Sequence, residues 1–142
     1  MRPLPLALGA ATLVAFAGII GIAAYGELLV RDVPFLFLHT DFLAKVVIFL
    51  SLAVVGWIAL APNRSHLTSS RLNSMAMLVA GLGLLVTVLL FNNPGLICVD
   101  ETKADMLKIM GPHHAQSLMP LAFGLLAATV ATARAGKRPA EA

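Results

Sequence analysis

Methionine and histidine side chains that could bind a soft metal ion gather in the segment 105–114. Met106, Met110 and either His113 or His114 recur at helical spacing, so they share one side of a helix. Thioether and imidazole ligands, together with a thiol, suit Cu(I). The other interpretation is an amphipathic helix at a membrane surface, in which methionine only fills apolar space. We adopt this second interpretation as the simpler one.

The remaining candidate ligands do not complete a metal or cofactor site. Cys98 and His39 are predicted on the same side of the membrane as the methionine segment. Bis-histidine haem ligation would need histidines that face each other within a helix bundle, whereas His39 and the 113–114 pair sit at predicted helix ends. A single cysteine forms no internal disulfide, and there is no CxxC pair. We therefore expect no metal and no cofactor.

Motifs of enzymes and of nucleic-acid-binding proteins are absent from the sequence. It contains no GxSxG, HExxH, P-loop or GxGxxG pattern. The formal net charge is +3, but the ten Lys and Arg residues are scattered singly, apart from a short cluster in the tail. Because no basic stripe exists, nucleic acid is not an expected partner. The chain is not predicted to be an enzyme.

The composition indicates an integral membrane protein. Of the 142 residues, 59% are hydrophobic and only 12% are charged. A soluble domain is about half apolar and about a quarter charged. A chain this apolar cannot cover its core with a polar surface, whereas a surface that faces lipid does not need one. The lipid bilayer is therefore the first expected partner.

Four apolar stretches approach the length of about 20 residues that a membrane-spanning helix requires. They predict helices over about 4–28, 42–61, 73–91 and 113–133. Each span should be helical because lipid leaves no partner for free backbone groups. The expected fold is all-α: one multi-pass membrane domain over 1–136, with four transmembrane helices in a bundle with short loops. A disordered cytoplasmic tail is expected at 137–142.

The first span has two interpretations. Arg2 followed by an apolar run and the sequence Ala15-Phe16-Ala17 is similar to a weak signal peptide. However, the run is long enough to span the bilayer, and its charged N-terminal part is a single arginine. A signal anchor that stays in the membrane is the interpretation that we adopt.

The distribution of basic residues predicts that both termini are cytoplasmic. With the N-terminus inside, six basic residues face the cytoplasm: Arg2, Arg64, Arg71, Arg134, Lys137 and Arg138. Four face the other side: Arg31, Lys45, Lys103 and Lys108. Because basic residues favour cytoplasmic loops, the predicted topology is N-in/C-in.

Three segments resemble the MotA/TolQ/ExbB proton channel family. HTDFLAKVVIFLSLAVVGW (39–57) is similar to the family's first membrane helix in its Asp41, Lys45 and Trp57. LGLLVTV (82–88) resembles the family's LGLLGTV, with Val86 in place of a glycine. GPHHAQSLMPLAFGLLAA (111–128) keeps the spacing of a family segment of the form GPxxAxALxTTxxGxxxA. The resemblance covers a little more than half of the chain.

The resemblance implies a function, a partner and a site residue. Family members form a homo-oligomeric ring of helices around a single-span partner, whose intramembrane Asp carries protons. In this family the last two helices form a hairpin and a threonine lines the ion path, which implies Thr87 as the ion-pathway residue. Besides Val86 and a Trp57 that comes about two residues early, the sequence departs from the family in two further places. Leu121 occupies the position where the last helix of the family usually has a threonine. Only residues 62–71 stand where the family usually has a large cytoplasmic insertion.

General side-chain chemistry gives the same residues simpler roles. A lone Thr87 in a membrane helix can bond back to a carbonyl of its own preceding turn. Asp41 and Lys45 lie four residues apart on one helix face and are expected to form an interfacial pair, with the lysine reaching outward. Pro120 removes a helix hydrogen bond and crowds the carbonyl of Gln116, so a kink is expected.

The sequence thus favours a subunit of a bacterial inner membrane that couples proton flow to movement of a partner protein. No span carries an ionisable residue at its centre, so a proton path would require a partner that brings one. The alternative is a non-transporting accessory or assembly subunit, which the short 62–71 link and Leu121 would suit. A copper-binding membrane protein that faces the periplasm is the third hypothesis.

Overall fold

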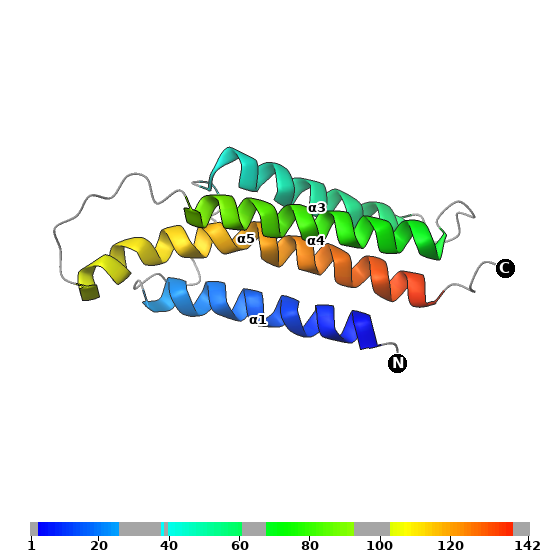
Figure 1. The fold of residues 1–142 in the computed structure, drawn as a ribbon, viewed down its shortest axis with the longest axis horizontal. Helices are drawn as coiled ribbons and strands as arrows, with labels where there is room; N and C mark the ends of the chain where they lie inside the picture. The colour runs from blue at the N-terminus through cyan, green and yellow to red at the C-terminus, as the bar shows by residue number, and fades with distance from the viewer. Residues whose placement is uncertain (1–2, 26–37, 39, 61–67, 93–102, 138–142) are drawn as a thin grey trace.

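The computed structural model describes residues 3–25, 38, 40–60, 68–92 and 103–137, with side chains placed for all of these except 23, 25, 92 and 103–113. They form four helices (Figure 1): α1 (Pro3–Tyr25), α3 (Phe42–Leu60), α4 (Ser69–Asn92) and α5 (Lys103–Gly136). No strand occurs within these described ranges, which confirms the all-helical class.

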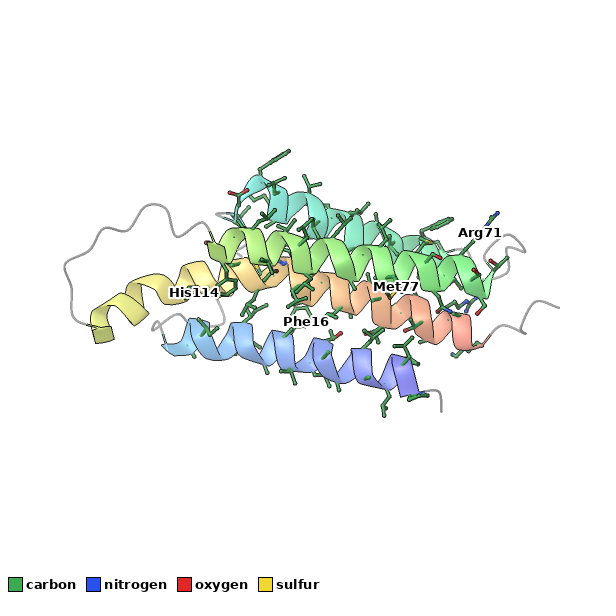
Figure 2. The ribbon with its side chains drawn as sticks, in the orientation of Figure 1. Phe16, Arg71, Met77 and His114 are labelled. Atoms are coloured by element: carbon green, nitrogen blue, oxygen red, sulfur yellow. The ribbon has the colours of Figure 1, made fainter. Side chains whose placement is uncertain are left out.

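Each helix contains a segment that is long and apolar enough to cross a membrane. The four segments are Pro3–Ile22, Phe42–Leu60, Ser69–Phe91 and His114–Gly136. Large apolar side chains cover the outside of the molecule, as Leu13 (73% exposed), Leu60 (86%) and Met77 (77%, labelled in Figure 2) illustrate. Such a surface needs a hydrocarbon solvent. The structure therefore supports a multi-pass membrane protein.

Side-chain caps fix where α3 and α4 begin. The Asp41 carboxylate accepts a hydrogen bond from the Leu43 N–H (3.0 Å). Thr68 does the same at the start of α4, where its hydroxyl accepts the Arg71 N–H (3.2 Å). The first N–H groups of a helix have no intrahelical acceptor, so these oxygens satisfy donors that would otherwise be unpaired. Thr68 also explains why α4 begins at Ser69, four residues before the predicted start at 73.

We expect the change Asp41→Ala to destabilise the protein by about 1 kcal/mol, because it removes the cap of α3. The free energy of unfolding can be measured by titrating SDS into mixed micelles and following far-ultraviolet circular dichroism. Asp41→Asn is the matched control, since the amide oxygen can still accept the Leu43 N–H. If both variants lose the same stability, the cap is not the source of the effect.

Helix α5 is central to the arrangement. It packs against α1, α3 and α4, and α3 also packs against α4. The four helices run side by side and alternate in direction (Figure 1). The start of α1, the end of α3, the start of α4 and the end of α5 therefore lie together. This is called the terminal end below, and the other is called the opposite end.

Small residues allow α5 to hold this central position. Six alanines of α5 are buried: Ala115, Ala122, Ala127, Ala128, Ala131 and Ala135. Toward the terminal end they pack with Ile58 of α3 and Leu72 of α4. Toward the opposite end they pack with Ile19 of α1 and Ile48 of α3. Small side chains let backbones approach closely, which is how helices associate in lipid without a hydrophobic driving force.

The last helix is longer than the sequence predicts. It begins at Lys103, ten residues before the expected start at 113, and runs unbroken through Gly111 and Pro112. The charged residues of 103–108 limit the part of the helix that can cross lipid, but they do not stop a helix in water. The membrane-crossing part begins at His114, close to the predicted boundary. The predicted residues 26–28 and the tail 138–142 lie outside the described residues.

Candidate functional site

The backbones of α4 and α5 approach each other closely at two glycines. A Cβ atom built on Gly83 would lie 2.5 Å from the carbonyl oxygen of Pro120, and one built on Gly124 would lie 2.8 Å from that of Val79. Real Cβ atoms essentially never come that close to a backbone atom. Val79 and Gly83 are four residues apart and share one face of α4. Each glycine is therefore required by the backbone of the other helix.

Thr87 lies one turn beyond Gly83 on this same face of α4. Its side chain is only 5% exposed. Its hydroxyl oxygen accepts a hydrogen bond from the backbone N–H of Leu121 on α5 (3.2 Å). Within the described residues, this hydroxyl accepts one hydrogen bond and donates none. Its proton therefore has no acceptor among the described residues.

Pro120 directly precedes the backbone N–H that Thr87 accepts. The side chain of Pro120 is fully buried, and its ring nitrogen carries no hydrogen. A proline ring also displaces the carbonyl one turn earlier, and the usual result is a bend. Figure 1 shows such a bend between the N-terminal (yellow) and C-terminal (orange) parts of α5. Thr87 supplies an oxygen acceptor to the N–H that directly follows the proline.

Four other hydroxyl groups bond differently. Thr12, Ser51, Thr129 and Thr132 each donate to the carbonyl four residues earlier in their own helix, at 2.7, 2.8, 2.7 and 2.8 Å. This is the local bond that the sequence offered as the simple interpretation of Thr87. Thr87 makes no such bond among the described residues, and it bridges two helices instead. The ion-pathway role of Thr87 stays a prediction.

A second polar contact joins α1 to α5. The hydroxyl oxygens of Thr12 and Thr129 lie 3.2 Å apart, and either group could donate to the other in place of its own helix carbonyl. Gly9, one turn before Thr12, lies within van der Waals reach of the same threonine, since its added Cβ would be 3.6 Å from the Thr129 methyl. Phe16 and Phe123 meet edge to face one turn further on (5.5 Å between ring centroids). These contacts hold the first helix onto α5.

The expected interfacial pair acts on the backbone. The Asp41 carboxylate binds the Leu43 N–H, as described above, while the Lys45 ammonium donates to the carbonyl of Leu38 (2.6 Å). Both groups thus sit where α3 begins, at the opposite end of the molecule. An ammonium held near a helix end can reach the lipid headgroups.

The methionine and histidine segment is described only in part. Met106, Met110 and His113 lie on the helical backbone of α5, but their side chains are outside the described residues, as are Cys98 and His39. The His114 ring stacks on Phe91 of α4, with 5.0 Å between centroids and 11° between planes. Among the described residues, no three His, Cys, Asp or Glu side chains gather as metal ligands.

The sequence indicated Thr87, Pro120 and the glycine-containing segments as notable. It did not indicate that Thr87 and Gly83 of α4 contact α5 at Pro120 and Leu121. The hydrogen bond to Leu121 joins residues 34 positions apart, and a backbone donor leaves no mark in the residue type. The four-residue spacing of Gly83 and Thr87 was a usable signal, because a small residue and a hydroxyl on one face indicate a helix interface. The pairing of Thr12 with Thr129 had no comparable signal.

Comparison with known proteins gives no family assignment. No protein-family model, no curated protein and no solved structure matches this chain.

Proposed function

We propose that the protein is a membrane subunit of the proton-channel or stator type, which couples proton flow to the movement of a partner protein. The observation that carries the proposal is the contact between positions 87 and 121. The family resemblance expects a threonine at both positions, and here Thr87 binds the backbone of Leu121 (3.2 Å). Two stretches that were matched to the family separately therefore meet at the two positions where the family has a threonine.

The proposed path runs along the contact of α4 with α5, at a surface that a partner helix covers. Leu121 is only partly buried, so this contact borders the outside of the protomer. Thr87 accepts from a backbone N–H and keeps its own proton for donation. A hydroxyl held in this way can hydrogen-bond to a water molecule or a carboxylate that approaches the site.

The proton carrier itself must come from a partner. The charged side chains that the structure describes within the helices lie near helix ends: Lys45 at the start of α3, Arg71 at the start of α4 and Arg134 at the end of α5. The proposal is therefore a homo-oligomer around a single-span membrane protein that carries an intramembrane Asp. The proposed setting is a bacterial inner membrane, with the terminal end and its basic residues in the cytoplasm.

The change Thr87→Val tests the proposal. We expect it to reduce proton uptake roughly tenfold, because one lost hydrogen-bond partner raises a transfer barrier by about 1.4 kcal/mol. Proton uptake can be measured with a pH-sensitive dye in inverted vesicles from the native host, which contain the partner. Thr87→Ser should restore uptake, since serine keeps the hydroxyl.

Thr12→Val is the matched control, since Thr12 is as buried as Thr87 (6% and 5% exposed) but lies on α1 and faces α5 at Thr129, away from the proposed path. Protein levels in the membrane must be equal for all variants. Unchanged uptake in the Thr87→Val variant at a normal protein level would contradict the channel proposal.

One observation favours a second candidate, a non-transporting accessory or assembly subunit. The Thr87 oxygen already accepts a hydrogen bond from the backbone of the bent helix α5. The aliphatic Leu121 occupies the position where the family has its second threonine. Native mass spectrometry of the tagged chain, extracted from its own host membrane, separates the two candidates. A homo-oligomer with a single-span protein supports the channel, whereas a stable complex with an unrelated membrane enzyme supports the accessory role.

A further inference from the structure

A pocket opens between the last turns of α3 and α5, at the terminal end and far from Thr87. Its volume is about 290 Å³, and its lining residues are Ile58, Ala59, Val130, Ala133, Arg134 and Lys137. Four of these six side chains are apolar and two are cationic. No acidic side chain occurs among these described lining residues. The pocket thus combines apolar side chains with two cationic ones, Arg134 and Lys137, which are called its cationic rim below.

The position of this pocket along the helices matches a membrane surface. The membrane-crossing segments end at Leu60 in α3 and at Gly136 in α5. Ile58 and Ala59 lie just inside the first of these boundaries, and Arg134 and Lys137 lie on either side of the second. At this depth hydrocarbon gives way to headgroups, so a lipid phosphate and the start of its acyl chains would lie at the same level as the pocket.

We propose that this pocket is a binding site for an anionic phospholipid. The lipid phosphate would pair with the Arg134 guanidinium and the Lys137 ammonium. The glycerol and upper acyl chain would lie on Ile58, Val130 and Ala133. A guanidinium binds phosphate oxygens through two parallel hydrogen bonds, and an ammonium adds a point charge. A soluble anion would use only the cationic rim, whereas a phospholipid uses the whole lining.

Charge complementarity selects the class of lipid. A zwitterionic headgroup carries its own cation, which would meet the two positive side chains of the rim. A headgroup with a net negative charge avoids this repulsion and gains from both cations. The proposal is independent of the proton-channel function, because Arg134 and Lys137 lie four turns of α5 beyond the contact of Thr87 with Leu121.

The test is native mass spectrometry of the full chain, released from nanodiscs that contain equal amounts of phosphatidylglycerol and phosphatidylcholine. We expect wild-type protein to retain phosphatidylglycerol preferentially. Arg134→Gln combined with Lys137→Gln should weaken this retention about tenfold, on the scale of two lost phosphate contacts. Ala133→Phe should weaken it as well, because this change fills the pocket and keeps both charges.

Arg71→Gln is the matched control. Arg71 lies at the terminal end (Figure 2) and is exposed, but it does not line the pocket. Equal losses of lipid in the Arg71→Gln variant and in the combined Arg134→Gln and Lys137→Gln variant would mean a general electrostatic attraction and would overturn the proposal. Equal retention of the two lipids by wild-type protein would also overturn the proposal. So would dissociation of a homo-oligomer in the Ala133→Phe variant, because the pocket would then be a contact between copies of the chain. Equal unfolding midpoints of all variants in phosphatidylcholine ensure that lost retention does not reflect lost folding.

Discussion

Replacement of Gly83 by alanine is expected to lower the free energy of unfolding by about 2 to 3 kcal/mol, at the upper end of the usual cost of overpacking. The new methyl group would lie 2.5 Å from the Pro120 carbonyl oxygen and 3.3 Å from the Cα of Leu121. Both are backbone atoms, so no side chain can rotate away to make room. The helices must separate, and separation also weakens the hydrogen bond from Leu121 to Thr87. SDS titration followed by circular dichroism measures the loss.

The matched control for this prediction lies two residues away on the same helix. Gly81 is exposed, and a Cβ atom added there meets nothing within 4 Å. Gly81→Ala should therefore leave stability unchanged or raise it slightly, because alanine forms helices better than glycine. Gly124→Ala should resemble Gly83→Ala, since its methyl group would lie 2.8 Å from the Val79 carbonyl oxygen. Equal stability of the Gly81 and Gly83 variants would show that α4 and α5 do not pack this closely.

Sequence alone predicts much of the fold because the constraint of the bilayer is strong. Length and polarity fixed the second helix to within one residue of the observed Phe42–Leu60. Helix ends were harder to predict, as the start of α5 at Lys103 illustrates. Charged residues end a membrane span without ending the helix, and hydropathy reports only the span. The central place of α5 depends on which small residues face one another, and a list of spans does not contain that information.

The candidate site was predictable only as separate parts. Thr87 stands out in the sequence as a hydroxyl group in an apolar helix, and Pro120 stands out as a proline inside a helix. Neither property indicates that the two residues lie on facing helices. The signal that links them is the glycine at position 83, since a close approach of backbones brings a hydroxyl within reach of a main-chain donor. The family resemblance expects a threonine at position 87 and another at position 121, but it does not place the two in contact. The structure joins the same positions through a backbone N–H, which Leu121 retains whatever its side chain.

The cost of removing the Thr87 hydroxyl should depend on Pro120. Thr87→Val keeps the side-chain shape and leaves the Leu121 N–H without this acceptor, so we expect a loss of about 1 to 3 kcal/mol. In a Pro120→Ala background, residue 120 regains its own N–H and the crowding of the Gln116 carbonyl disappears. The helix can then straighten, and the Leu121 N–H can bond to the Ser117 carbonyl within its own helix. Thr87→Val should therefore cost less in that background.

A double-mutant cycle measures this dependence directly. We expect the effects of Thr87→Val and Pro120→Ala to be non-additive by about 1 kcal/mol, within the range for residues that share one network. Thr12→Val combined with Pro120→Ala is the matched cycle, and it should be additive because Thr12 bonds to Leu8 and Thr129, away from the proline. Additivity in both cycles would mean that the Thr87 hydroxyl does not stabilise the bend in α5 at Pro120. The hydroxyl would then not stabilise the contact of α4 with α5. Any loss of proton uptake in the Thr87→Val variant would therefore reflect its role in the proton path.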